Sequence, residues 1–234
     1  MKITSLDNPK IKYLVKLNKA SFRKEEKKFI VEGPHLVKEA RLKGVLLEAY
    51  SIEEKEDYIQ IPETIMKKIC NTDTVVSEIA LCQMVEANEL SNRLLILDGV
   101  QDPGNMGALM RSAKAFGFNT IILGEGSVDI YNDKVIRASQ GAIFKLNFIH
   151  KNLIEFIPTL KDYEVYGTNV VNGISLDNVK KNKKMAIILG NEGKGISPSL
   201  NAILKQNIYI PMDNTESLNV SVAGGIIMYE LRLD

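Results

Sequence analysis

Five short, continuous apolar segments in residues 93–234 alternate with segments of helical periodicity, and this alternation limits the possible folds more than any other feature. We expect strands at 94–98, 120–123, 164–167, 185–189 and 208–210. Apolar runs without polar alternation are typical of strands that are buried on both faces of a parallel sheet. The intervening helices supply the crossovers that parallel strands require. Residues 93–234 are therefore predicted to form an α/β domain whose parallel sheet is covered on both sides.

The remaining elements follow from the same periodicities. The helices expected between the strands lie at about 106–116, 132–140, 153–160, 199–205 and 218–231. The first 90 residues alternate strands and helices on a smaller scale and predict a small α/β domain. A polar break at 88–92 is the best candidate boundary, so we expect domains at 1–90 and 91–234.

The charge is uneven along the chain, although the net charge is only +1. Residues 1–43 hold twelve Lys and Arg against five Asp and Glu, whereas residues 44–91 hold three against ten. Phosphate backbones attract such basic clusters through Coulomb attraction and counterion release. The candidate RNA-binding residues are Lys10, Lys12, Arg23, Lys24, Lys27 and Lys28. The alternative is a solvated helix face whose lysines only aid solubility.

Several classes of protein are excluded by what the sequence lacks. No apolar run approaches the roughly 18–20 residues of a membrane span, and the N-terminus has no apolar signal core, so we expect a cytoplasmic protein without membrane association. Two cysteines and two histidines form no cluster of metal ligands, so no metal is expected. The dinucleotide motif GxGxxG is absent, and the phosphate-loop motif fails because Gly195 follows Lys194 where Ser or Thr is required.

Three loops that follow predicted strands are rich in Gly, Asn and small polar residues. They lie at 98–111, 189–196 and 210–221. Each loop alone could be a glycine turn followed by an Asn or Ser helix cap. In open parallel sheets, however, ligands bind beyond the carboxyl ends of the strands. The three loops together therefore predict one binding site at one edge of the sheet.

The three loops resemble the three motifs of the SpoU/TrmH class of RNA ribose 2′-O-methyltransferases. Residues 102–113 (DPGNMGALMRSA) resemble motif 1, and residues 189–195 (LGNEGKG) resemble motif 2. Motif 3 is resembled by residues 210–212 (IPM) with 217–221 (SLNVS). The order and the spacing of all three agree with the class, which makes the resemblance specific.

The resemblance implies S-adenosylmethionine as the methyl donor, a C-terminal trefoil knot that forms its pocket, and a homodimer joined through the knotted domains. Knots are otherwise almost absent from proteins. The N-terminal part is similar, more loosely, to an RNA substrate-binding domain of ribosomal-protein type, through residues 3–12 (ITSLDNPKIK) and 29–33 (FIVEG). The implied cofactor contacts are Gly190, Ile210, Leu218, Asn191, Met212, Gly124 and Thr168.

The catalytic residues that the resemblance implies are Arg111, Asn105, Glu192, Ser217 and Asn219. None of the three loops holds a histidine, so imidazole base catalysis is not available. The class gives Arg111 a catalytic role, sometimes as a general base after contact with an RNA phosphate. A guanidinium is a fixed, planar cation, which favours phosphate anchoring and alkoxide stabilisation instead.

The other catalytic candidates each have a structural alternative. Asn105 is expected to hold Arg111 or the ribose, or to cap its helix. Glu192 is expected to orient Arg111 or a motif 3 group, or to be a surface carboxylate. Ser217 and Asn219 are expected to bind the ribose or the methionine end of the cofactor, or to cap the last helix.

The sequence as a whole predicts an enzyme that methylates a ribose 2′-hydroxyl of structured RNA. The separate N-terminal domain favours rRNA, because the shortest tRNA-directed members of the class have only short terminal extensions. Two alternatives stay open: a tRNA 2′-O-methyltransferase, and a non-catalytic RNA-binding factor of ribosome assembly with the same fold. The intact set of catalytic candidates argues against the second.

Overall fold

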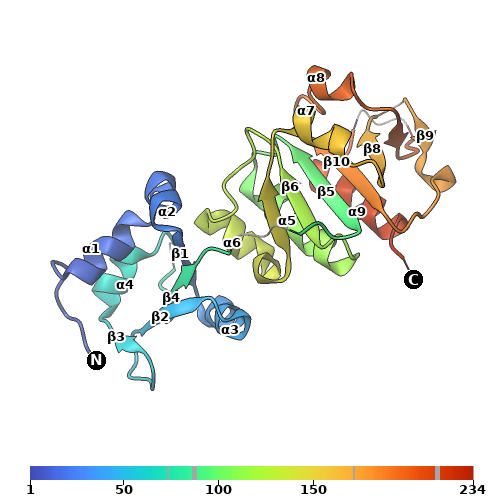
Figure 1. Ribbon diagram of the computed structural model, residues 1–234. Coiled ribbons are helices and arrows are strands. Elements are labelled where there is room, and N and C mark those ends of the chain that lie inside the picture. The colour runs from blue at the N-terminus through green and yellow to red at the C-terminus, as the bar shows by residue number, and fades with distance from the viewer. Residues whose placement is uncertain (73, 86–88, 171, 214–216, 234) are drawn as a thin grey trace. The chain divides into compact units, whose positions relative to one another are not determined.

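The computed structural model describes residues 1–72, 74–85, 89–170, 172–213 and 217–233. The chain forms two compact units (Figure 1). The first contains residues 1–85 together with 129–144, and the second contains the rest of the chain. The polar break expected to separate the domains begins at Asn88, which lies outside the described residues.

The first unit is built on a four-stranded sheet, counted over the described residues, in the order β1-β4-β2-β3. Its strands are β1 (Lys28–Glu32), β2 (Leu46–Ser51), β3 (Ile59–Gln60) and β4 (Glu78–Gln83). β4 pairs antiparallel with β1 and with β2, and β2 pairs parallel with β3. The small α/β domain expected at the N-terminus is therefore present.

Helices cover both faces of this sheet (Figure 1). They are α1 (Pro9–Lys16), α2 (Ala20–Glu26), α3 (Pro34–Lys43) and α4 (Glu63–Ile69). The first begins where the Asn8 side chain accepts a hydrogen bond from the backbone of Lys10. The apolar side chains of α1 pack in one core with those of α4, and this buried face explains the amphipathic pattern of α1.

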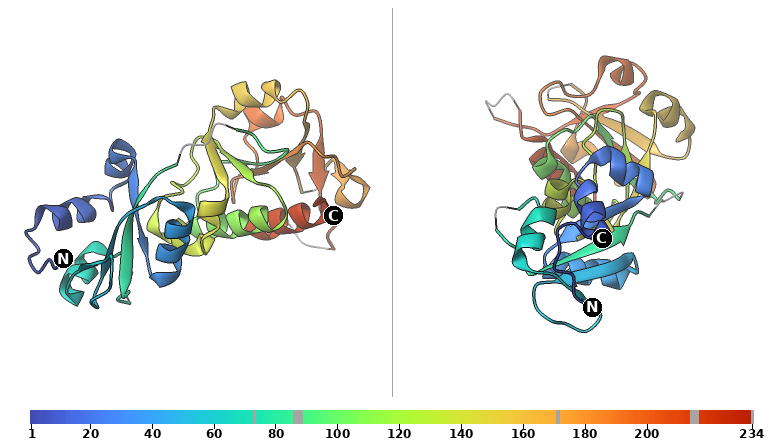
Figure 2. Two further views of the ribbon diagram at one scale, coloured as in Figure 1. Left: turned by 60° about the horizontal axis from the view of Figure 1, so that its bottom comes forward. Right: turned by 90° about the vertical axis from the view of Figure 1, so that its left-hand side faces the viewer.

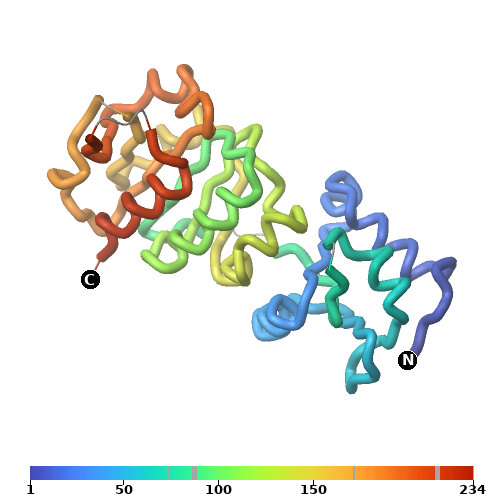
Figure 3. Tube along the Cα trace, turned by 180° about the vertical axis from the view of Figure 1, so that it is seen from behind, coloured from blue at the N-terminus to red at the C-terminus, as the bar shows by residue number. Residues whose placement is uncertain are grey.

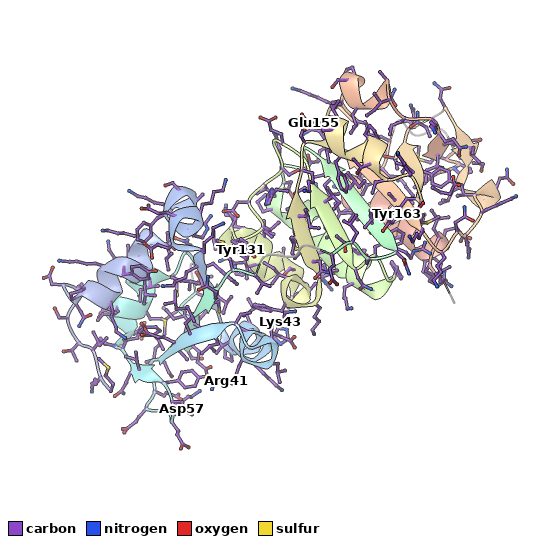
Figure 4. The ribbon with its side chains drawn as sticks, in the orientation of Figure 1. Arg41, Lys43, Asp57, Tyr131, Glu155 and Tyr163 are labelled. Atoms are coloured by element: carbon purple, nitrogen blue, oxygen red, sulfur yellow. The ribbon has the colours of Figure 1, made fainter. Side chains whose placement is uncertain are left out.

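Residues 129–144 lie within the first unit, although in the sequence they fall between two segments of the second unit. They contain α6 (Asp133–Ser139) and most of a short 3₁₀ helix (Ala142–Lys145). Tyr131, labelled in Figure 4, packs its ring 4.6 Å from that of Phe29 on β1. Arg137 forms an ion pair with the buried Glu32. These contacts attach the segment to the N-terminal sheet.

Arg23 corrects one of the predicted RNA contacts. Its side chain is only 7% exposed and forms a 2.6 Å ion pair with Asp129. It also donates hydrogen bonds to the backbone carbonyls of Leu17 and Asn18. The guanidinium is therefore occupied within the fold, and Arg23 is withdrawn from the RNA-binding surface.

Replacing Arg23 by alanine should lower the free energy of unfolding of the first unit by about 3–5 kcal/mol, since Asp129 would keep a partly buried charge without its partner. Urea unfolding monitored by circular dichroism measures this change. The neighbouring exposed Lys24→Ala is the matched control and should change it by no more than about 0.5 kcal/mol. Equal effects of the two substitutions would contradict a structural role for Arg23.

The second unit contains a seven-stranded sheet, counted over the described residues, in the order β7-β6-β5-β10-β8-β11-β9. Its strands are β5 (Arg93–Asp98), β6 (Thr120–Leu123), β7 (Asn147–His150), β8 (Glu164–Thr168), β9 (Ile174–Ser175), β10 (Met185–Gly190) and β11 (Asn207–Tyr209). All neighbouring pairs are parallel, which confirms the predicted sheet. β7 and β9 were missed because they are short strands at the sheet edges without a continuous buried run.

Helices pack on both faces of the second sheet (Figure 2). They are α5 (Pro103–Ala115), α7 (Leu153–Phe156), α8 (Pro198–Asn201) and α9 (Val220–Glu230), with short 3₁₀ helices at Ile157–Thr159 and Leu176–Asn178. Figure 3 shows α5 and α9 next to each other. At Gly224 in α9, an added Cβ would lie 2.5 Å from Leu109 and 2.6 Å from Leu189, so the absence of a side chain permits the close packing of this layer.

The strand order reverses between β5 and β10. From β5 the chain moves outward to β6 and β7 on one side, whereas β8 to β11 lie on the other side. The loops that leave the carboxyl ends of β5 and β10 therefore diverge, and ligands bind at such a reversal in open α/β sheets. No helix in the described parts of the chain has the length and apolar character needed to cross a membrane.

Candidate active site

A cavity of about 500 Å³ opens beyond the carboxyl ends of β8, β10 and β11. This volume is in the range of ordinary small-molecule sites. Six of the seven predicted cofactor contacts line it: Thr168, Gly190, Asn191, Ile210, Met212 and Leu218. Ser217 and Glu192 from the predicted catalytic set line it as well. The second and third loops of the sequence thus enclose one cavity.

Gly124 is the exception among the predicted cofactor contacts. It is buried at the end of β6 and is absent from the lining of the cavity. A Cβ at this position would lie 2.6 Å from Leu153 and 3.0 Å from the carbonyl oxygen of Leu97. The lack of a side chain at Gly124 is explained by packing, and its contact with the cofactor stays a prediction.

The loop after β10 is a tight turn that closes on itself. The backbones of Asn191 and Gly195 exchange two hydrogen bonds, each 2.9 Å long. The Asn191 side chain accepts hydrogen bonds from the backbone of Gly193 and Lys194 and donates one to the carbonyl of Gly99. Asn191 therefore shapes the cavity wall and joins the second loop to the first.

Asp98 provides another connection between these loops, and the sequence prediction missed it. Its carboxylate accepts a 2.7 Å hydrogen bond from the backbone N–H of Ser197. A polar residue at the end of the otherwise apolar strand 94–98 was the signal that could have identified it. Lys194 was also missed. It belongs to the glycine-rich loop and lines the cavity.

Asn105 connects all three loops through its side chain. Its amide nitrogen donates to Glu192 at 3.3 Å, and its amide oxygen accepts from the Asn219 side chain at 3.0 Å. The sequence left open that Asn105 caps its helix. In the structure Asp102 caps α5, by accepting a hydrogen bond from the backbone N–H of Asn105. Among the described residues, the Asn105 side chain bonds Glu192 and Asn219 rather than Arg111, and its expected contact with the ribose stays a prediction.

Glu192 binds the first loop. It accepts hydrogen bonds from the backbone N–H groups of Gln101 and Asp102, at 3.2 and 2.9 Å. Burial, the largest single influence, raises the pKa of Glu192, but the backbone donors and Asn105 together outweigh it and hold the pKa below its ordinary value. The ionised carboxylate thus orients Asn105 and the first loop. One expectation had been that Glu192 orients Arg111 instead.

Asn219 and Thr168 also have defined partners. Asn219 caps α9 by accepting hydrogen bonds from the backbone of Ser221 and Val222, in addition to its bond with Asn105. The Thr168 hydroxyl donates to the carbonyl of Ile188 at 2.9 Å. The capping role expected as the alternative for Asn219 is present, and it fixes the side chain beside the first loop.

Arg111 lies on the exposed face of α5. Within the described part of the chain it forms no hydrogen bond or ion pair and does not line the cavity. Whether it acts in catalysis stays a prediction.

The remaining basic candidates in the first unit differ in their surroundings. Lys10 forms an ion pair with Glu48, and Lys12 forms one with Asp7 at 2.8 Å. Lys28 lies over the ring of Tyr13, 5.5 Å from its centroid. Lys24 is exposed, and Lys27 ends α2 in the left-handed conformation. Their role in binding RNA stays a prediction.

Comparisons with known proteins agree with this geometry. The model of the SpoU rRNA Methylase family matches residues 92–229, and the model of the MRM3-like substrate binding domain matches residues 8–80. The 23S rRNA (guanosine(2553)-2′-O)-methyltransferase RlmP of Bacillus subtilis is 34% identical, and the match covers 98% of both chains.

Two solved structures extend the comparison. An RNA 2′-O ribose methyltransferase is 27% identical with a TM-score of 0.81, over 99% of this chain and 98% of that one. An AdoMet-bound rRNA methyltransferase from Sinorhizobium meliloti has a TM-score of 0.88 over 99% of this chain and 97% of that one. Its identity of 23% limits that likeness to the fold.

Proposed function

This chain belongs to the SpoU rRNA methylase family, and we propose that it transfers the methyl group of S-adenosylmethionine to a ribose 2′-hydroxyl of rRNA. The observation that carries the proposal is the junction at Asn105. There, side chains from three loops that are far apart in the sequence meet beside one cavity. An enzyme that must align two substrates needs such a fixed junction.

The cavity fits an adenosyl cofactor. Leu189, Ile210 and Leu218 offer apolar surface for a base, and Asn169, Thr168 and Ser217 add polar groups for a sugar. When bound, the cofactor supplies a methyl group that its sulfonium has already activated. The protein then has to position the hydroxyl, and positioning alone can supply roughly 7–11 kcal/mol of a barrier.

Arg111 is proposed to anchor an RNA phosphate and to stabilise the developing alkoxide. A guanidinium offers several donors in one plane and suits both tasks. Glu192 and Asn219 are proposed as positioning residues that hold Asn105 from opposite sides. Ser217, on the cavity wall, is proposed to contact the ribose or the methionine end of the cofactor.

We further propose a homodimer joined through the second unit, in which the last helix passes through the loops as a trefoil knot. An apolar stripe on α9 supports the dimer: Val222, Ile226 and Tyr229 are 39–51% exposed. Arg111 does not line the cavity of its own chain, so a site completed by a second copy would explain its place. The knot is supported by residues 217–218 and the loop after β10, which line the same cavity.

The division of labour follows the two family matches: the first unit binds structured RNA and the second methylates it, in the cytoplasm. The double substitution Lys12→Ala/Lys24→Ala should weaken RNA binding and reduce the slope of log K against log salt by about one for each phosphate that is no longer neutralised. Fluorescence anisotropy with an rRNA fragment measures both. Lys161→Ala/Lys183→Ala on the second unit is the matched control. An unchanged salt slope in the first pair would exclude these lysines from the RNA surface.

The proposed activity is tested with purified protein, S-adenosylmethionine carrying a labelled methyl group, and 23S rRNA or tRNA from cells that lack the protein. The expected product is a single ribose-methylated nucleoside in the rRNA, located by mass spectrometry. Labelled methyl groups in tRNA alone would show that the substrate is tRNA and not rRNA. Cofactor binding without label in either RNA would favour a non-catalytic RNA-binding factor.

A further inference from the structure

A second cavity, of about 370 Å³, lies at the other ends of α5 and α9 from the candidate active site. Arg93, Lys114 and Arg232 line it together with Phe116, Gly117 and Asn119. Every charged side chain among its described lining residues is a cation. Neither the family match nor the proposed reaction gives this cavity a role.

Arg93 is the deepest of the three cations. It is 4% exposed, and its guanidinium lies 4.6 Å from the ring centroid of Phe118. Nη2 donates to the carbonyl of Leu231 and approaches the sulfur of Met185, whereas Nε and Nη1 have no hydrogen-bond partner in the described part of the chain. A buried cation with unused donors is costly unless an anion compensates it.

The other two cations are held in place by neutral partners. Lys114 donates to the side-chain oxygen of Asn119 at 3.1 Å. Arg232 stacks on Tyr229, 3.8 Å from the ring centroid, and donates to the Tyr229 carbonyl. Neither forms an ion pair with a described carboxylate.

We propose that this cavity binds a small oxyanion, a phosphate group, between Arg93, Lys114 and Arg232. A phosphate accepts several hydrogen bonds at once, and all three cations line this one cavity. The phosphate is either free in solution or part of an RNA backbone. Arg93, which holds the two unused donors, is itself a lining residue of the cavity.

The bound phosphate would act on two helices that also reach the candidate active site. Lys114 is on α5, which carries Asn105 and Arg111, and Arg232 follows α9, whose first turns line the cofactor cavity. The oxyanion would therefore tie together the C-terminal ends of both helices. This inference does not depend on the proposed methyl transfer.

The test is thermal unfolding at increasing inorganic phosphate, with the ionic strength held constant by chloride. The expected result is a saturable rise in Tm, of about 2–4 °C for each kcal/mol of binding free energy. Lys114→Ala/Arg232→Ala should raise the apparent phosphate Kd at least about tenfold, whereas the exposed Lys183→Ala leaves it unchanged. Arg93 is left unchanged in these variants, because it donates a hydrogen bond to the carbonyl of Leu231 at the end of α9.

Two further arms complete the experiment. The titration is repeated with Asp234→Asn, which removes one side-chain carboxylate from the end of the sequence. Binding of a short mixed-sequence RNA duplex separates the sources: a weaker affinity of the double variant identifies an RNA phosphate, and an unchanged one identifies free phosphate. The proposal would be overturned if phosphate changed the Tm of neither the original protein nor Asp234→Asn. It would also be overturned if phosphate raised the Tm of Lys114→Ala/Arg232→Ala as much as that of the original protein.

Discussion

Gly190→Ala should weaken S-adenosylmethionine binding by about 100-fold, equivalent to about 2.7 kcal/mol. An alanine Cβ at this position would lie 2.0 Å from the carbonyl carbon of Gly195 and 2.1 Å from the nitrogen of Ile196. Both are backbone atoms, so the loop itself must move, and that loop forms a wall of the cofactor cavity. Overpacking of this kind costs about 1–3 kcal/mol, so Tm should also fall. Calorimetric titration measures the affinity.

Gly193→Ala is the matched control in the same loop. The nearest atom to its added Cβ is 3.8 Å away, so the substitution needs no movement. Its cofactor affinity should stay within about twofold of the original protein. Equal losses in both variants, or an unchanged affinity in Gly190→Ala, would show that the loop after β10 does not form the cofactor site.

Arg111→Ala should reduce kcat by about 10²–10³, the usual effect of removing one donor that stabilises developing negative charge. Arg111 has no hydrogen-bond partner or ion pair in the described part of the chain and is exposed on α5. Its removal should therefore leave both Tm and the cofactor Kd unchanged. Single-turnover methylation of rRNA measures the chemical step apart from product release.

Arg111→Lys distinguishes a planar contact from charge alone. Lysine keeps the positive charge but lacks the guanidinium plane that binds a phosphate through two donors. It should therefore recover less than a tenth of the original turnover. Near-normal turnover of the lysine variant would exclude recognition by the guanidinium plane, and normal turnover of the alanine variant would exclude any catalytic role.

The parallel sheet could be predicted because its central strands are continuous apolar runs separated by segments of helical periodicity. Leu94, Leu95, Ile96 and Leu97 are all fully buried, which is the environment that such a run indicates. The three polar loops then had to share one sheet edge, because parallel strands place their carboxyl ends together. β7 and β9 lie at sheet edges, where this pattern is absent.

Contacts between distant residues could not be predicted in this way. Nothing in the sequence distinguishes Arg23 from the exposed Lys24 as an RNA contact, because the ion-pair partner of Arg23, Asp129, comes 106 residues later. For the same reason residues 129–144 were not expected within the first unit. A hydrogen-bonded junction such as that of Asn105 depends on side-chain directions that no spacing encodes.

Hydrogen–deuterium exchange with and without saturating S-adenosylmethionine tests the central claim most directly. If the loop after β10, the end of β11 and the start of α9 enclose the cofactor, their amides should exchange more slowly when it is bound, and those of the first unit should not. Slower exchange elsewhere, with these three segments unaffected, would contradict the assignment of the cavity.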